Sequence, residues 1–452
     1  MAIVAPFKGF TYNLSYGQEF SKLVAPPYDV ISEEEQEEYY QAHPHNVIRL
    51  ILGKKKTGDT DWDNRYTRAA DYLKRWESDG ILVRAKEPAI YLTSLTYKPQ
   101  DTENERTRWG FIALVRIEDQ DSGVILPHER TFSAHKDDRL KLIRACNTQF
   151  SQIFGLYEDN ENSILEACKA HAGQQPLLSF EFKDGTRHNV WVIKSPALFR
   201  LVSEAMKNKT IFIADGHHRY ETSRNFRNIM RARYGRRNPN RSYEYVMMYL
   251  TNMSDEGLTI LPSHRLIKWV PNFELQEFLQ KAKTWFEIED ITLSNHSTRS
   301  KAEAIQDILR RKGGKRSAMG FYPNGSESCF ILTLDEAKRD QMGDDLHPAL
   351  KELDVLVLSR FLFQKTLGFS REELDDEKTF QYQSSLIQAI QSVESGQAQM
   401  AFFLNPTKIE QVKEVARNFL VMPRKSTYFY PKVITGLVFN KIDPYETIDT
   451  FS

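Results

Sequence analysis

The stretch IFIADGHHRYETSRNF, residues 211–226, joins a strand, a glycine turn and a helix in direct succession. Its apolar start, Ile211 to Ile213, predicts a buried strand, and the basic run after the turn, closed by Gly235, predicts a helix. Gly216 permits a tight turn between the two and lets a ligand approach the backbone closely. This order of elements is typical of an α/β fold.

The residues on both sides continue the alternation of strands and helices. Before the turn, the β-rich run NVWVIK is followed by the helical stretch ALFRLVSEAMKN. The runs at 88–97 and 109–118 predict a hairpin with a long polar loop. Helical spacing of apolar residues at 63–77, and Ser32 before an acidic run, predict two further helices. We therefore predict a mixed α/β chain.

The composition limits the classes of protein to which this chain can belong. Its 452 residues suggest two or three domains, and its 61 Lys and Arg balance its 61 Asp and Glu, which argues against a basic nucleic-acid coat. No run approaches the roughly 20 apolar residues of a membrane helix. The start of the chain lacks the pattern of a secretory leader, so we expect a cytoplasmic protein. Three cysteines without paired spacing argue against a disulfide framework or a cysteine zinc site.

The turn DGHHR, residues 215–219, is the densest local signal for chemistry. The free amides at a helix start favour an anion, and Arg219 with the two histidines adds donors, which suits a phosphate group. His217 and His218 could instead bind a metal ion, although sequence neighbours on a turn rarely face one ion. In a third alternative, these side chains cap the helix and satisfy buried polar groups. The residues alone leave all three alternatives open.

Two further clusters could take part in such chemistry. His128 and Glu129 follow an apolar run and a proline, and a glutamate in this setting can act as a general base. Lys425, Ser426 and Thr427 offer a cation and two hydroxyls, enough to hold a phosphate or a carboxylate. No GxxxxGK precedes them, so they do not form a nucleotide P-loop. The alternatives are a salt-bridged surface element for the first cluster and an ordinary strand for the second.

A fourth position is Asp29, on the stiff backbone that follows Pro26 and Pro27. Its carboxylate could serve a magnesium ion, or it could cap the helix that begins near Ser32. Capping is the simpler interpretation.

Over nearly its whole length, the chain resembles a family of bacterial and archaeal proteins of unknown function, of the DUF1015 type. The segments that carry this resemblance are APPYDVI, LPHERT, IADGHHRYE, LPSHRL and MPRKSTYFYPK. Three motifs also resemble those of the archaeal free serine kinases, which belong to the ParB and sulfiredoxin-like superfamily and phosphorylate the free amino acid. The DGHHR motif is the same in this chain and in the kinases. The PHE motif of the kinases corresponds to residues 127–129 of this chain. The late PKTT segment of the kinases resembles PRKST at residues 423–427.

The resemblance implies a ParB/sulfiredoxin-like core with inserted and added α/β layers. The core would span residues 121–270, after an N-terminal α/β layer at 1–120. A C-terminal α/β domain at 271–452 would return the segment 422–433 to the site. The implied activity is a phosphotransferase that acts on free L-serine or O-phosphoserine, with ATP or ADP as the second substrate and Mg²⁺ bridging the phosphates. The balanced charge and the lack of a long apolar run argue against a nucleic-acid partner and a membrane partner.

The resemblance also assigns roles to the candidate residues. Gly216 to Arg219 would cradle the nucleotide phosphates, and Glu129, beside His128, would take the proton of the serine hydroxyl. Asp215 would orient the next histidine or bind the metal ion through water, and Asp29 is the other candidate for the metal ion. The amino-acid carboxylate or its phosphate would be held by Lys425, Ser426 and Thr427.

Two rival functions would use the same phosphate-binding site. A phosphoserine phosphatase would use water in place of the nucleotide, and a non-catalytic ParB-like switch would bind a nucleotide and control a partner. The sequence leaves open the nucleotide preference, the direction of the reaction, the oligomeric state and the role of residues 273–354.

Overall fold

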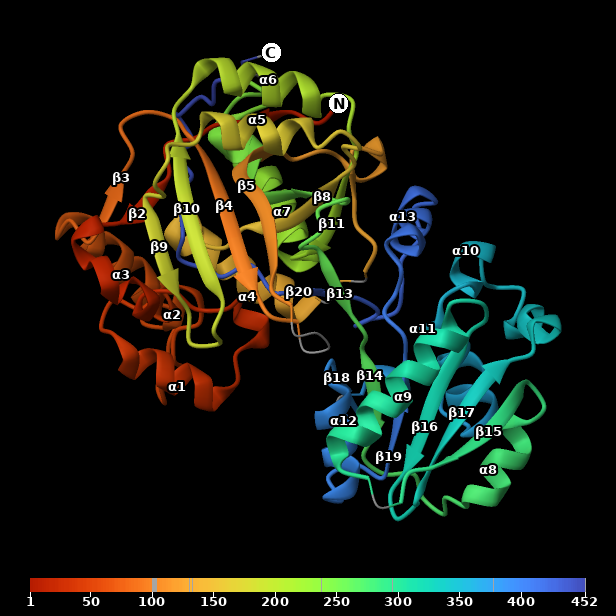
Figure 1. The fold of residues 1–452 in the computed structure, drawn as a ribbon. Helices are drawn as coiled ribbons and strands as arrows, with labels where there is room; N and C mark the ends of the chain where they lie inside the picture. The colour runs from red at the N-terminus through yellow and green to blue at the C-terminus, as the bar shows by residue number, and fades with distance from the viewer. Residues whose placement is uncertain are drawn as a thin grey trace. The chain divides into compact units, whose positions relative to one another are not determined.

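The computed structural model describes residues 1–99, 104–129, 131, 133–236, 238–294, 296–376 and 378–451. The chain divides into two compact units (Figure 1). The first contains residues 1–127, 131–259 and 431–452, and the second contains residues 128–130 and 260–430. Helices and strands are mixed in both, which confirms the predicted α/β class. Within the described ranges, no helix combines the length and apolar character that a membrane crossing requires.

A nine-stranded sheet forms the centre of the first unit. Its order is β6-β11-β8-β12-β5-β4-β10-β9, and β1 pairs with β5. The strands are β1 (Val4–Ala5), β4 (Ile90–Tyr97), β5 (Arg106–Arg116), β6 (Ile125–Leu126), β8 (Ile153–Tyr157), β9 (Leu178–Glu181), β10 (Arg187–Ile193), β11 (Ile211–Asp215) and β12 (Tyr245–Asn252). β11 runs parallel to β6, and β12 runs parallel to β8. β4 and β5 form the predicted hairpin, whose loop residues 100–103 lie outside the described residues.

The first unit also contains α-helices. They are α1 (Glu33–Ala42), α2 (Ile48–Ile51), α3 (Arg65–Ser78), α4 (Ser133–Cys146), α5 (Ser163–His171), α6 (Pro196–Met206) and α7 (His217–Tyr234). Leu165 of α5 and Val202 of α6 are buried in one apolar core with Phe111 of β5 and Met248 of β12. Burial of such side chains drives the packing of helix on sheet.

α1 begins where the sequence predicts, but its cap differs from one prediction. The Ser32 hydroxyl accepts the Glu35 N–H, and the Glu35 carboxylate accepts the Ser32 N–H, so the two residues form a capping box. Asp29 lies earlier, in the short 3-10 turn η2 (Tyr28–Val30). The prediction that Asp29 caps this helix is therefore wrong, because Ser32 satisfies the helix start by itself.

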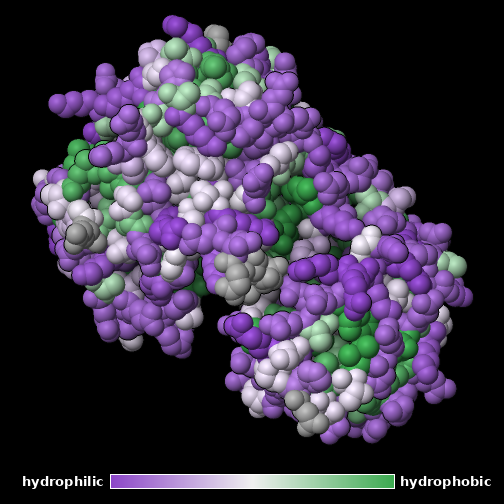
Figure 2. Space-filling model, viewed as in Figure 1, coloured by the Kyte–Doolittle hydropathy of each residue, from purple (hydrophilic) through white to green (hydrophobic). Residues whose placement is uncertain are grey.

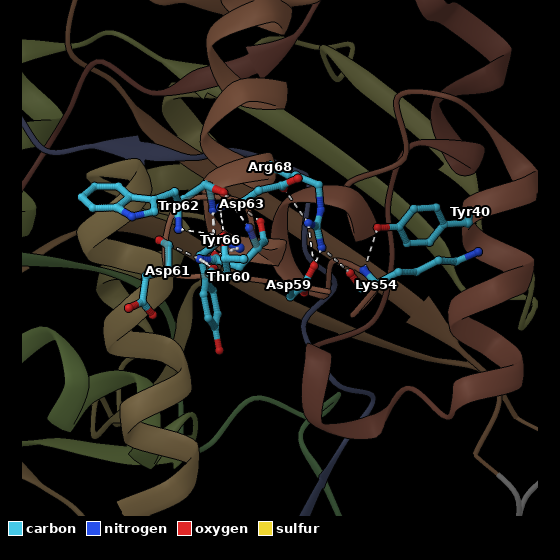
Figure 3. A network of polar contacts seen from close by, with 11 residues as sticks. Tyr40, Lys54, Asp59, Thr60, Asp61, Trp62, Asp63, Tyr66 and Arg68 are labelled. Atoms are coloured by element: carbon cyan, nitrogen blue, oxygen red, sulfur yellow. Dashed lines mark hydrogen bonds and ion pairs between the residues drawn. The ribbon is translucent and has the colours of Figure 1, made fainter. Parts of the chain in front are cut away.

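The loop before α3 is held by a network of polar contacts (Figure 3). Arg68 Nη1 donates to Asp59 Oδ1 at 2.8 Å and to Asp63 Oδ1 at 2.7 Å. From the same helix, the Tyr66 hydroxyl donates to Asp138 of α4 at 2.6 Å. α4 in turn packs against α7, so the orientation of α3 helps to position the helix that follows the DGHHR turn.

The second unit has a six-stranded antiparallel sheet in the order β15-β17-β16-β19-β14-β18. The strands are β14 (His264–Ile267), β15 (Phe286–Thr292), β16 (Ala318–Pro323), β17 (Ser328–Leu334), β18 (Phe380–Gln383) and β19 (Met400–Phe403). Phe321 and Phe402 belong to one buried cluster, and their neighbours Tyr322 and Phe403 belong to another. This alternation shows that both faces of the sheet are covered, because successive side chains of a strand point to opposite faces.

Helices cover both faces of the six-stranded sheet. α9 (Thr298–Gly313) and α12 (Leu386–Glu394) contribute to the cluster that contains Phe403. α8 (Leu275–Ala282), the π-helix η6 (Leu358–Thr366) and α13 (Ile409–Arg417) contribute to the other cluster. Figure 2 shows hydrophilic residues over most of the face in view, with apolar residues in smaller patches. The unit therefore has layers of helix, sheet and helix.

The compact units differ from the three predicted ranges. Strands on both sides of residue 120 belong to one sheet, so no unit boundary lies there. The chain enters the second unit at residue 260 rather than 271, and residues 431–452 return to the first unit. The pairing of β5 with β12 accounts for the missing boundary at residue 120, because it joins segments from both sides of that residue. The roles assigned to the three ranges stay a prediction.

Candidate functional site

The DGHHR turn lies in the first unit, between β11 and α7. β11 is buried as far as Ala214 and ends at Asp215, and α7 begins at His217. Gly216 has a φ of 92°, in the left-handed region that favours glycine. It is the N-cap of α7, and as a glycine it has no side chain that could bond the first amides of the helix. The turn therefore places the positive end of a helix at the end of a strand, as predicted for an anion site.

Asp215 forms a buried ion cluster with Arg219 and Lys432. Arg219 Nη2 donates to Asp215 Oδ2 at 2.5 Å, and the Lys432 ammonium donates to Oδ1. Arg219 also donates to the backbone carbonyl of Gln152. Burial by itself would raise the pKa of Asp215, but the charges of Lys432 and Arg219 outweigh it and hold this pKa well below its usual range. The carboxylate stays ionised, and the guanidinium is directed at protein partners.

The two histidines of the turn have different surroundings. His217 is buried, and burial lowers its pKa to about 3, so the imidazole is neutral at neutral pH. His218 is half-buried, and its ring centroid lies 5.0 Å from that of His135 in α4. Because His218 is the less buried of the two, an arriving phosphate would meet it and the helix amides first. The phosphate would reach Arg219 only in competition with the Asp215 carboxylate.

A small cavity of about 60 Å³ lies beside Arg219. Its polar lining includes Arg139, Ser151, Thr222 and Ser223. Tyr28 lies in its wall, and the Arg139 guanidinium stacks on the ring of Tyr28 at 3.9 Å from the centroid. Burial raises the pKa of Tyr28 to about 12, so this phenol stays protonated. The sequence analysis singled out Asp29 of the PPYD segment, whereas the residue of this segment that lines the cavity is Tyr28.

The residues of the turn do not fit a magnesium ion. Both oxygens of the Asp215 carboxylate bond cationic side chains, whereas Mg²⁺ in a protein takes oxygens that are directed at the metal. Over the described part of the chain, no three His, Cys, Asp or Glu side chains gather closely enough to hold a metal ion. A nucleotide phosphate does fit the turn, because helix amides and cations are its usual partners.

In the second unit, the PHE segment lies against the PRKST segment. The Met422 N–H donates to the His128 carbonyl at 2.8 Å, and Glu129 forms a parallel bridge with Met422. Glu129 Oε1 accepts the backbone N–H of Lys425 at 3.1 Å. His128 Nε2 lies 3.1 Å from Thr427 Oγ1. The structure thus brings together two predicted motifs that lie 296 residues apart in the chain.

The hydroxyls of the PRKST segment bond groups of the protein itself. Ser426 Oγ donates to the Pro423 carbonyl at 2.6 Å, and Thr427 Oγ1 contacts the His128 ring. Lys425 has a φ of 55°, which is uncommon for a residue with a side chain. Strained backbone of this kind concentrates at functional sites. The substrate roles of Lys425, Ser426 and Thr427 stay a prediction.

Each unit therefore gathers part of the predicted set. The first unit combines residues 215–219 with Lys432, and the second combines His128 and Glu129 with residues 425–427. Sequence reasoning missed Lys432, although it lies inside the predicted segment 422–433. No motif or spacing marks this lysine, and only the return of residues 431–452 to the first unit places it at Asp215.

Most of the chain matches one protein family. Residues 4–356 match the family described as "Protein of unknown function (DUF1015)". The chain belongs to this family. No curated protein matches this DUF1015 chain.

Several solved structures are similar to this DUF1015 chain, with low sequence identities and low TM-scores. An AMP complex of a mutant free serine kinase is 12% identical, covers 70% of this chain and 87% of its own, and has a TM-score of 0.34. An ADP complex of another mutant is 11% identical over 74% and 91%, with a TM-score of 0.35. C-terminally truncated SbnI from Staphylococcus aureus is 8% identical over 72% and 85%, with a TM-score of 0.32. These scores carry no conclusion, and the ParB/sulfiredoxin-like core stays a prediction.

Proposed function

We propose that this chain is a nucleotide-dependent phosphotransferase that acts on free L-serine or, in the reverse direction, on O-phosphoserine. The observation that carries the proposal is the turn at Gly216, where a helix start with a glycine N-cap lies beside the cations of Arg219 and Lys432. Helix amides and cations next to a glycine turn are a recurrent phosphate site. The serine substrate comes from the resemblance of the three motifs to those of free serine kinases.

Asp215 holds the two cations in place until a nucleotide binds. Its carboxylate bonds both Arg219 and Lys432, so these side chains need little reorganisation when phosphate oxygens arrive. The phosphate oxygens then share the cations with Asp215, and the positive charge offsets the charge that develops on the transferred group. His217, which burial keeps neutral, can still donate one hydrogen bond.

Glu129 is the proposed general base. Its role rests on the resemblance of residues 127–129 to the PHE segment of the free serine kinases. In the forward reaction the carboxylate takes the serine hydroxyl proton, the new oxygen–phosphorus bond forms, and the bond to the nucleotide oxygen breaks. Lys425 would bind the amino-acid carboxylate. No step depends on a metal ligand from this chain.

Product analysis with radiolabelled O-phosphoserine separates this proposal from its rivals. With ADP present, the label is expected to appear in ATP, and without a nucleotide it is expected to stay on phosphoserine. Release of labelled inorganic phosphate without a nucleotide would identify a phosphatase instead. Nucleotide binding without transfer in either direction would indicate the ParB-like switch.

The variant Glu129→Gln tests the base while it keeps the hydrogen bond of this side chain to the backbone. The amide oxygen of glutamine can still accept the Lys425 N–H, so the fold of the segment is retained. Loss of a general base lowers turnover by about 10²- to 10⁴-fold, while nucleotide affinity by calorimetry stays unchanged. Glu274→Gln, at an exposed glutamate of the same unit, is the matched control and should keep full activity. Full turnover by Glu129→Gln would refute the assigned role.

A further inference from the structure

Arg265 of β14 is a buried cation of the second unit. β14 lies between β18 and β19 in the six-stranded sheet (Figure 1), and Arg265 is 6% exposed. Its Nη1 donates to the Ser263 carbonyl at 2.8 Å and to the Ser263 hydroxyl at 2.6 Å. The guanidinium also stacks on the ring of Tyr382 in β18, at 4.5 Å from the centroid. These contacts fix the guanidinium before any ligand binds.

Among the described residues, no carboxylate forms an ion pair with Arg265. Two other buried arginines, Arg139 and Arg227, each form an ion pair with an aspartate. Burial lowers the pKa of Arg265 to about 10, so its side chain is still charged at neutral pH. In the described part of the chain Nε has no hydrogen-bond partner, and Nη2 has only a long contact, 3.5 Å from the Arg424 carbonyl. Because buried charges in proteins are usually paired, the Nε–Nη2 edge is the part of this cation that can receive an anion.

One peptide unit links Arg265 to Glu129, the proposed general base. Its carbonyl, that of Arg424, accepts a hydrogen bond from Nη2 of Arg265, and its N–H, that of Lys425, donates to Glu129 Oε1 at 3.1 Å. Because the oxygen and the nitrogen of a peptide unit are held at a short fixed distance, Nη2 and Oε1 lie at most roughly 9 Å apart. The negative charge of Glu129 favours the charged form of Arg265, and the positive charge of Arg424 opposes it. Glu129 and Arg265 are therefore neighbours that leave space for a small molecule between their charged groups.

We propose that Arg265 binds the carboxylate of the amino-acid substrate and thereby selects the free amino acid. This inference rests on the proposed function, because it takes Glu129 as the base for the serine hydroxyl. Two hydrogen bonds of about 2.8 Å with a serine molecule between them span a distance similar to that between Nη2 and Oε1. The Nε–Nη2 edge matches a carboxylate through two parallel hydrogen bonds, and Lys425 would add a point charge to the same group. An amide in place of the carboxylate would leave the buried guanidinium unpaired, so the site rejects serine whose carboxyl group is blocked.

L-Serinamide tests this contact on the unaltered protein, because it carries a neutral amide in place of the carboxylate of L-serine. Phosphate transfer to each compound is measured on the full chain with ATP and with ADP as donor, and binding of each compound is measured by calorimetry. L-Serine is expected to exceed L-serinamide at least about tenfold in kcat/KM and in affinity, because a hydrogen-bonded charge is lost in the amide. Equal values for the two compounds would overturn the proposal.

Arg265→Met then assigns the preference to this residue, since exchange of a buried charge for an apolar side chain is often neutral for stability. Its kcat/KM for L-serine is expected to fall at least about tenfold, and its kcat/KM for L-serinamide should stay unchanged. Arg265→Lys keeps the charge without the fork and should retain part of the preference. Arg299→Met, at an exposed arginine of α9 in the same unit, is the matched control and should retain all of it. An unchanged preference in Arg265→Met, or in Arg265→Lys if the first variant does not fold, would overturn the proposal.

The two measurements separate this inference from the proposed function. Binding of L-serine that depends on Arg265, without phosphate transfer, would support the carboxylate contact and refute the phosphotransferase. Phosphate transfer to L-serine with an unchanged preference in Arg265→Met would support the phosphotransferase and refute the contact. Failure of the unaltered protein to bind L-serine would overturn both.

Discussion

Replacement of Asp215 by asparagine tests the ion cluster on which the proposed function depends. Arg219 bonds one oxygen of the carboxylate and Lys432 bonds the other. The asparagine amide has one oxygen and one NH₂ group, so in either orientation the NH₂ group faces a cation. The variant removes the only negative charge of this cluster and leaves two cations close together.

The magnitude follows from the burial of the three side chains. Asp215 is 12% exposed, Arg219 is 11% exposed and Lys432 is 16% exposed. Water therefore screens the two remaining charges poorly. Breaking a buried ion pair by removal of one partner costs about 3 to 5 kcal/mol. At about 2 °C per kcal/mol for a unit of this size, the melting temperature is expected to fall by roughly 6 to 10 °C.

Urea unfolding at neutral pH, followed by tryptophan fluorescence, measures this loss. Asp63→Asn is the matched control, because Asp63 also pairs with an arginine, Arg68, but its side chain is 74% exposed. A surface pair of this kind contributes about 0 to 1 kcal/mol. The control variant is therefore expected to unfold close to the unaltered protein.

Added phosphate or pyrophosphate should partly restore the Asp215→Asn variant. An anion in the turn supplies the negative charge that the cations have lost, and a ligand at 100 times its Kd stabilises the folded state by about 2.7 kcal/mol. The unaltered protein should gain less, since there the anion competes with the Asp215 carboxylate. An equal gain in both proteins would refute anion binding at the turn. A loss below 1 kcal/mol in Asp215→Asn would refute the buried cluster itself.

Two further predictions concern the turn and the acid stability of the same unit. Gly216→Ala should cost roughly 1 to 3 kcal/mol, because its φ is 92° and a Cβ would lie 3.0 Å from the Arg219 guanidinium. Gly185→Ala, at a φ of 79° with no atom within 4 Å, should cost less in the same urea assay. Burial lowers the pKa of His188 to about 4 from 6.5, so only the unfolded state takes up a proton as the pH falls between these values. Stability should therefore fall by up to about 1.4 kcal/mol per pH unit in this window, and His188→Phe should reduce the slope of urea-derived stability against pH by that amount.

Local structure at the site could be predicted from the sequence because its causes lie within a few residues. Glycine between an apolar run and a basic amphipathic run predicts the β11–α7 turn, and Gly216 adopts the left-handed conformation there. Ser32, with a glutamate three residues later, likewise predicts the start of α1. Local rules did not decide which side chain caps this helix, because both Asp29 and Ser32 are suitable N-cap residues close to its start.

The sequence by itself determined the alternation of strands and helices, the strand, glycine turn and helix at residues 211–226 and the balance of charge. Only the tertiary structure decided that Lys432 pairs with Asp215 and that Glu129 bonds the backbone of Lys425, across 217 and 296 residues. Neither contact has a local cause, since each depends on the order in which strands join a sheet and on where the last segment of the chain packs. Such contacts form when burial of distant apolar segments outweighs the entropy of closing long loops, and no short motif records that balance.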